Sequence, residues 1–230
     1  MRFAQRMKWT LYGPDALLFH FADKLGDAAF AKGRAIVAEL ENHPPPGLTE
    51  FVPAFTTVLL EFDPKQVPDP VRIAPDLAAR LEATAAAEIA SAPIKDIPVV
   101  YDGPDLERVA QHNRLSIDGV IALHSATIYK VYVLGFAPGF PYLGDLDPRL
   151  HTPRLPSPRT RVPAGSIGIG GEHTGIYSVA SPGGWNIIGH TALKILDPGR
   201  AKTEASEESM FYLRHGDQVR FVGVTVKSNP

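Results

Sequence analysis

The sequence predicts an α+β protein with two domains, a small α+β module over residues 1–93 and a β-rich domain over residues 94–230. Three observations support this prediction. The length of 230 residues suits one large domain or two small ones. The first part alternates short strand-like runs with helical periodicity. The second part holds many short apolar runs separated by glycine and proline, which is typical of a closed barrel or a sandwich.

The first part contains four apolar runs of strand length and two runs with helical periodicity. The predicted strands cover residues 8–12, 16–21, 49–55 and 57–62. A helix is expected from Asp27 to His43, because Pro44 cannot continue it. A second helix is expected over residues 76–91, with Pro75 at its first position. This order of elements predicts one sheet that is covered on one side by two helices.

The second part begins after a predicted linker at residues 91–98, where two prolines flank a polar patch. Two short helices are expected over residues 105–112 and 116–123, the second with Ser116 as its N-cap. Residues 197–209 are polar and predict a surface loop. The predicted strands cover residues 99–101, 128–134, 160–162, 166–169, 176–180, 185–188, 191–196 and 219–226.

Residues 135–189 are the richest part of the chain in glycine and proline. They hold 11 of the 20 glycines and 8 of the 22 prolines, interleaved with aromatic and branched side chains that a linker lacks. Glycine permits a positive φ or a close backbone approach, and proline fixes φ, so the segment specifies sharp turns. We expect it to form a barrel wall, a pocket or both.

Composition excludes several classes of protein. The chain has no cysteine, which removes disulfides, thiolate chemistry and cysteine-ligated zinc. A net charge of −2 favours neither nucleic acid nor a membrane surface as a partner. No apolar run reaches the length of a signal peptide or a membrane helix, so a cytoplasmic protein is expected. The eight histidines include no pair at helical ligand spacing, so no protein-bound metal is predicted.

A long motif fills the middle of the second part. It reads GFxPGFxYLGxLD, two PR pairs, VPAGSxGI, GxxTGIY and SPGGWxxIG, with YDGPDL and Leu123-His124-Ser125 before it. On these residues the chain resembles the family of the 5-oxoprolinase B component (PxpB), also named KipI or allophanate hydrolase subunit 1. The similarity covers residues 10–226 and is strongest over 99–191. His190 and His173 depart from the family pattern, which commonly has arginine and glutamine there.

The resemblance implies a fold and an activity. The second domain is expected to be a cyclophilin-like β-barrel. The chain is expected to be a subunit of an ATP-dependent 5-oxoprolinase, which opens 5-oxo-L-proline to L-glutamate with ATP, with or without magnesium. The implied partners are a KipA-like protein (allophanate hydrolase subunit 2) and a LamB/YcsF-type protein. Two alternatives stay open, an inhibitor of a sensor histidine kinase and a carboxyltransferase or allophanate hydrolase component of urea degradation.

Two arginines among prolines are the main candidates for an anion site. Arg154 and Arg159 match the family's two PR pairs, and a guanidinium offers a planar fork to a carboxylate or phosphate. The alternative is that both are long side chains in solvent. His124 and Arg159 are the candidate catalytic residues, although His124 can equally be a structural histidine. The full anion-binding set is Arg154, Arg159, Ser166, Tyr177, Gly183 and Gly184.

Aromatic residues and glycine turns complete the candidate site. The expected pocket-lining residues are Phe136, Pro138, Phe140, Tyr142 and Trp185, with core packing as the alternative. Two familiar motifs fail on inspection. The sequence around Ser166 lacks the first glycine and the following helix of a nucleophile elbow, so a pocket hydroxyl is the better interpretation. No P-loop sequence occurs.

Overall fold

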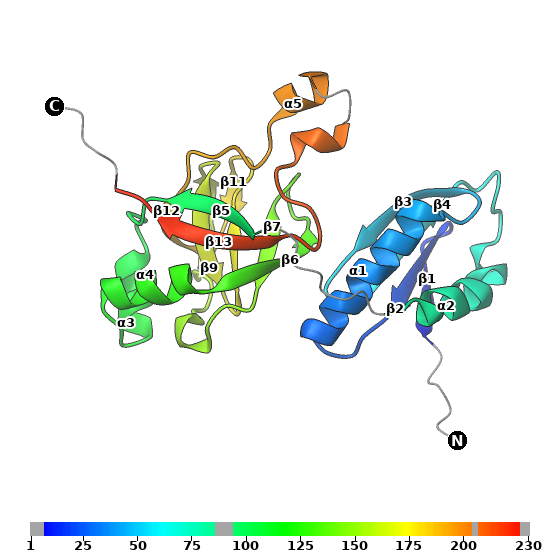
Figure 1. Ribbon diagram of the computed structural model, residues 1–230, viewed down its shortest axis with the longest axis horizontal. Helices are drawn as coiled ribbons and strands as arrows, with labels where there is room; N and C mark the ends of the chain where they lie inside the picture. The colour runs from blue at the N-terminus through cyan, green and yellow to red at the C-terminus, as the bar shows by residue number, and fades with distance from the viewer. Residues whose placement is uncertain (1–6, 86–93, 204–206, 226–230) are drawn as a thin grey trace. The chain divides into compact units, whose positions relative to one another are not determined.

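The computed structural model describes residues 7–85, 94–203 and 207–225. The chain divides into two compact units, Met1–Ala90 and Ser91–Pro230, each with its own core. Figure 1 shows the helices and strands of each unit.

The first unit is a four-stranded antiparallel sheet with two α-helices. The strand order is β1 (Lys8–Tyr12), β2 (Ala16–His20), β4 (Thr57–Phe62) and β3 (Leu48–Pro53). The helices are α1 (Asp27–Asn42), the 3-10 turn η1 (Pro70–Arg72) and α2 (Ala74–Ala83). All neighbouring strands pair antiparallel, as short hairpins and one longer connection allow.

One face of this sheet is buried under both helices. Leu17 pairs with Leu60 and Phe19 with Val58 in the β2–β4 register, so all four side chains lie on one face. They form a single core with residues of both helices, which are Ile36, Leu40, Leu77, Ala78 and Leu81. Figure 1 shows α1 running along the strands. The predicted one-sided α+β arrangement is therefore confirmed.

The second unit is built on a seven-stranded sheet. The strand order is β12 (Asn186–His190), β9 (Ser166–Gly170), β10 (His173–Ile176), β7 (Pro141–Gly144), β6 (Ile128–Leu134), β13 (Gln218–Gly223) and β5 (Ile94–Val99). A two-stranded sheet pairs β8 (Arg159–Val162) with β11 (Ser181–Gly183). The helical elements are α3 (Leu106–His112), α4 (Ile117–Ala126), η2 (Pro148–Leu150), α5 (Pro198–Thr203) and η3 (Glu207–Met210). Among the seven strands only β13 and β5 pair in parallel.

The two edges of the seven-stranded sheet meet through an isolated bridge. The N–H of Val100, just after β5, donates to the carbonyl of His190 at 2.9 Å, and the N–H of His190 donates back at 2.9 Å. We call this junction the seam. It requires glycine, because a Cβ on Gly189 would lie 2.5 Å from the carbonyl oxygen of Val100. A Cβ on Gly103 would lie 2.3 Å from that of Ile187. The sheet is therefore a nearly closed barrel.

Two predictions near the junction of the units, the extent of the second helix and the linker over residues 91–98, differ from the structure. The second helix begins at Ala74 and ends at Ala83, and residues 86–91 of the prediction lie outside the described part. Its end is capped by Lys32, whose ammonium donates to the carbonyls of Glu82 at 2.9 Å and Thr84 at 2.5 Å. The predicted linker is also a strand from residue 94, since β5 tolerates Pro98 at the edge of the sheet.

Several strand predictions in the barrel also differ from the structure. Of the strand predicted over residues 176–180, only the first residue lies in a strand, and the residues 191–196 form no strand. Strand β7 was not predicted, because Pro141 and Gly144 resemble turn residues. Gly144 instead makes room for a ring, since a Cβ there would lie 2.1 Å from Tyr132. The predicted loop 197–209 contains the short helical elements α5 and η3.

Candidate functional site

The barrel has a cavity of about 340 Å³ beside the seam, which we call the seam cavity. This volume is in the range of sites for small ligands. Polar and charged groups share its walls with proline and aliphatic side chains. Its lining residues are Asp102, Gly103, Pro104, Arg159, Val162, Pro163, Ala164, Ser166, Ile187, Gly189 and His190.

A histidine–aspartate pair lies on one wall of the seam cavity. Nδ1 of His190 donates to a carboxylate oxygen of Asp102 at 2.8 Å, and the two side chains are 48% and 57% exposed. Ser166 is the register partner of His190 across β9 and β12, so hydroxyl and imidazole share one face of the sheet. A β-bulge between Ile187 and Gly189 sets this register.

An arginine–aspartate pair lies on another wall. The guanidinium of Arg159 donates to one carboxylate oxygen of Asp105 at 2.8 Å, and the other oxygen accepts the N–H of Ile187 at 2.7 Å. Asp105 is buried, and the Arg159 side chain is 32% exposed. A second N–H of Arg159 points to the carbonyl of Trp185 at 3.4 Å. The cation is therefore largely neutralised by its own carboxylate.

The charge pattern limits what the seam cavity can hold. Arg159 is paired with the carboxylate of Asp105, and His190 is paired with that of Asp102. A triphosphate carries several negative charges and requires cations that are not already compensated. The residues present therefore do not fit ATP. They suit a small polar ligand that has one charge and both donor and acceptor groups.

The predicted aromatic pocket residues form a packed cluster beside the cavity. The ring centre of Phe140 lies 5.0 Å from that of Tyr142, 5.3 Å from Tyr177 and 5.4 Å from Trp185, all edge to face. Phe140, Tyr177 and Trp185 are buried and pack with Val162 and Ile187. Because these last two residues also line the seam cavity, the cluster forms the floor behind it.

Glycines make room for this aromatic cluster. A Cβ on Gly170 would lie 2.6 Å from the Trp185 ring, and one on Gly175 would lie 3.0 Å from both Phe140 and Trp185. A Cβ on Gly183 would lie 2.1 Å from the hydroxyl of Tyr177. The predicted anion donor Gly183 thus has a packing role in this structure, and it does not line the seam cavity.

The other predicted residues lie at the edge of the cluster. Phe136 is 62% exposed and has a φ of +70°, which is unusual for an aromatic residue. The carbonyl of Pro138 accepts the hydroxyl of Ser178 at 2.6 Å, and that of Gly184 accepts a backbone N–H at 2.6 Å. Arg154 is exposed, with its guanidinium carbon 5.8 Å from the centre of the Trp185 ring.

His124 lies in the barrel core and does not line the seam cavity. It is fully buried and stacks on Phe221 with ring centres 4.5 Å apart. The Tyr101 hydroxyl donates to its Nδ1 at 2.8 Å, and its Nε2–H donates to the Thr174 hydroxyl at 2.9 Å. That hydroxyl in turn donates to the carbonyl of Gly168 at 3.1 Å, which fixes the tautomer. Burial lowers the pKa of His124 to about 3, so the ring is neutral.

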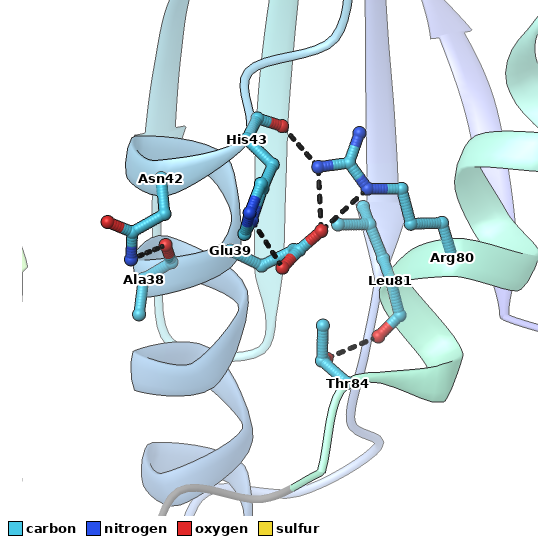
Figure 2. Close-up of polar contacts among 7 residues, drawn as sticks. All are labelled: Ala38, Glu39, Asn42, His43, Arg80, Leu81 and Thr84. Carbon is cyan, nitrogen blue, oxygen red and sulfur yellow. Dashed lines mark hydrogen bonds and ion pairs between the residues drawn. The ribbon is translucent and has the colours of Figure 1, made fainter.

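A larger cavity of about 700 Å³ lies in the first unit. Its walls are mainly proline and aliphatic side chains, and the two arginines at its rim are paired with carboxylates. Arg72 bonds to Asp69 at 3.0 Å, and Arg80 bonds to Glu39 at 2.7 Å. Figure 2 shows that Arg80 also donates to the backbone carbonyl of His43. Gln66 and Asp76 also line this cavity, and none of the site residues predicted from the sequence lies in it.

Metal sites and membrane spans are both absent from the described residues. They contain no group of three or more histidine, aspartate or glutamate side chains that could hold a metal ion. Among the same residues, no helix has both the length and the apolar character needed to span a bilayer.

Comparison with known proteins identifies the family. The sequence matches the family described as carboxyltransferase domain, subdomain C and D, over residues 7–206. The chain belongs to this family. It is 38% identical over 227 residues to the B component of 5-oxoprolinase from Bacillus subtilis, covering 94% of this chain and 92% of that protein. It is 55% identical over 130 residues to the Escherichia coli O157:H7 protein of the same name, covering 55% and 56%.

Solved structures of this carboxyltransferase-domain family show the same fold. The protein TTHA0988 superposes with a TM-score of 0.78 at 38% identity, over 94% of this chain, which spans only 41% of that protein. The uncharacterized protein PH0987 from Pyrococcus horikoshii is 38% identical over 96% of this chain and 99% of its own, with a TM-score of 0.55. Urea carboxylase of Kluyveromyces lactis, at 20% identity and a TM-score of 0.73, shares the fold over 95% of this chain and 22% of its own.

The sequence analysis missed half of the polar side chains that line the seam cavity. Arg159 and Ser166 were predicted and do line it, whereas Asp102 and His190 in the lining, and Asp105 behind Arg159, were not among the candidates. The sequence contained a signal for each, since both aspartates belong to the YDGPDL motif and His190 departs from the family pattern. Only closure of the barrel brings these distant segments together.

Proposed function

We propose that this chain is a subunit of a 5-oxoprolinase, a hydrolase complex that opens the lactam of 5-oxo-L-proline to give L-glutamate. The observation that supports this most is the 38% identity to the B component of Bacillus subtilis 5-oxoprolinase, which extends over 92% of that protein. Because the match spans both units, it supports a shared role for the whole chain.

We place the substrate in the seam cavity. 5-Oxoproline is small and carries one carboxylate, one amide N–H and one carbonyl oxygen. The cavity offers the guanidinium of Arg159, the hydroxyl of Ser166 and the carboxylate of Asp102, in a volume of about 340 Å³. Arg159 would orient the substrate carboxylate and Ser166 would donate to its carbonyl. A neutral or singly charged ligand agrees with the paired charges of the walls.

We assign the remaining candidates to supporting roles. His124 has both ring nitrogens bonded in the core, so we propose a structural role in place of a catalytic one. Tyr177, Trp185 and the glycine at 183 hold the floor of the cavity. Arg154 and the exposed Phe136 lie outside the cavity, and we propose that they contact another protein of the complex.

We propose that ATP binds to a different protein of the complex. The seam cavity does not fit a triphosphate, because the charge of Arg159 is compensated by Asp105 and the carboxylate of Asp102 adds a negative charge to the wall. The proposed partners are a KipA-like protein (allophanate hydrolase subunit 2) and a LamB/YcsF-type protein. We place this complex in the cytoplasm, where ATP is available.

The test is to co-express the chain with these two partners and to measure phosphate release with and without 5-oxoproline. We expect phosphate and glutamate in equal amounts, and only when 5-oxoproline and all three proteins are present. Leaving out this chain should abolish the stimulation. If 5-oxoproline causes no increase in phosphate release, the proposal is wrong.

The same preparation separates the two alternatives. A urea-carboxylating role is favoured by the family description and by a 29% identity over 127 residues to a putative urea carboxylase of Emericella nidulans. That match covers only 10% of the fungal protein. Urea-dependent phosphate release in place of 5-oxoproline-dependent release would support it. Inhibition of histidine kinase autophosphorylation by the isolated chain would support the regulatory alternative.

A further inference from the structure

We propose that His190 transfers protons in the seam cavity and that Asp102 positions it for this role. The inference rests on the proposed function, because it assigns a residue to the reaction of the same cavity. Both side chains line the cavity, and Nδ1 of His190 lies 2.8 Å from the carboxylate of Asp102. With its proton on Nδ1, the ring leaves Nε2 free to accept or release a proton.

The backbone of His190 is fixed by hydrogen bonds, although its side chain is exposed. Its N–H and carbonyl both bond to Val100 at 2.9 Å across the seam. Asp102 follows Val100 by two residues. The bridge that closes the barrel therefore also brings the side chains of Asp102 and His190 together. The adjacent β-bulge turns His190 to face Ser166. Positioned groups on rigid strands are what proton transfer requires.

The charged side chains that line the cavity beside His190 are each paired. Asp102 is bonded to the His190 ring at 2.8 Å. Arg159 is the other charged residue that lines the cavity, and its charge is offset by Asp105 at 2.8 Å. The ring can therefore take up a proton without facing an uncompensated cation.

The proposed step breaks the lactam carbon–nitrogen bond and forms a carbon–oxygen bond to water. As the water oxygen attacks the carbonyl carbon, Nε2 of His190 accepts the proton that the water loses. The imidazolium then donates this proton to the ring nitrogen, which leaves as an amine. The products are a carboxyl group and an amine, and His190 returns to its neutral form.

The experiment uses the reconstituted complex and compares variants of the pair. His190→Ala and His190→Gln should each lower kcat about 100-fold or more with KM for 5-oxoproline nearly unchanged. Asp102→Asn should lower kcat less, by about tenfold, again with KM for 5-oxoproline nearly unchanged, because the carboxylate acts through the orientation of the ring.

A matched control comes from the first unit. His43 also pairs Nδ1 with a carboxylate, that of Glu39 at 3.3 Å, and its side chain is exposed (Figure 2). His43→Ala should leave both kcat and KM unchanged. Arg159→Ala should instead raise KM, because this residue orients the substrate in the proposed function.

The outcomes separate this inference from the function on which it rests. A large fall in kcat for both His190 variants, a smaller fall for Asp102→Asn and an unchanged KM in all three support the proton-transfer role. Activity of His190→Ala within about threefold of wild type overturns the inference, and an impaired Arg159→Ala would then leave the proposed function standing. No 5-oxoproline-dependent activity in the wild-type complex overturns both.

Discussion

The barrel core around His124 and the seam around His190 place the same side chain in opposite settings. Nδ1 is hydrogen-bonded in both, to the Tyr101 hydroxyl in the core and to the Asp102 carboxylate at the seam. In the core Nε2 is also bonded, to Thr174, and no water reaches the ring. At the seam the ring borders a cavity. The difference teaches that a histidine's role depends on the charge of its partner and on the access to its second nitrogen.

The largest effect is expected from His124→Ala. The substitution leaves a buried void and removes the partners of the Tyr101 and Thr174 hydroxyls. We expect the free energy of unfolding of the barrel to fall by about 3 to 5 kcal/mol. Urea denaturation followed by Trp185 fluorescence in a Trp9→Phe background reports the barrel alone. A decrease in the free energy of unfolding of less than about 1 kcal/mol would remove the distinction between core and seam.

Acid should weaken the core next. The pKa of His124 is about 3 in the folded protein against an ordinary value of 6.5, so the unfolded chain binds the proton first. The contribution to stability is complete above pH 6.5 and is lost as the pH falls toward 3. Between pH 7.5 and 5, we expect a loss of about 2 kcal/mol from this group. The urea midpoints of wild type and His124→Gln should converge over this range, and parallel curves would contradict the assignment.

Arg159→Ala should have an intermediate effect. It leaves the buried carboxylate of Asp105 with the N–H of Ile187 as its remaining partner. Because the arginine side chain is 32% exposed, water replaces part of the lost contact, and we expect a destabilisation of about 1 to 2 kcal/mol. Arg154→Ala is the control, with an expected loss of about 0.5 kcal/mol from its contact with the Trp185 ring. Equal losses for the two variants would show that Asp105 does not need its partner.

The smallest change in stability is expected for His190→Ala. Both members of its pair are about half exposed, and the seam is closed by backbone bonds that the substitution retains. We expect the free energy of unfolding to change by less than about 1 kcal/mol. Thermal unfolding of His190→Ala beside wild type measures this change. A loss as large as that of His124→Ala would make His190 a structural residue.

The first unit could be predicted from sequence because its signals are local. Apolar runs of strand length identified β2 and β4, and the helical period after Asp27 identified α1. Prolines and glycines misled where their role is set by packing. Gly175 and Gly183 were interpreted as turn or pocket residues, whereas they give space to aromatic rings from other strands. No local pattern reveals which ring will lie over a glycine.

The candidate site could be predicted only in part for a similar reason. Arg159 and Ser166 come from a segment with a conspicuous motif, and they do line the cavity. The pair of Asp102 and His190 is formed by residues 88 positions apart in the sequence. His124 was a candidate because a histidine at the end of an apolar helix can have either role. Only its burial and its two neutral partners distinguish them.

The position of β13 has a consequence for how the protein is made. This strand lies between β6 and β5, although it follows both by more than eighty residues. The sheet of the first unit is complete once residue 62 has left the ribosome, and domains generally fold as units from the N-terminus during synthesis. The barrel cannot be completed this early. Its first strand, β5, gains its parallel neighbour only when residues 218–223 have been synthesised. The seam and the cavity beside it are therefore among the last features of a nascent chain to form.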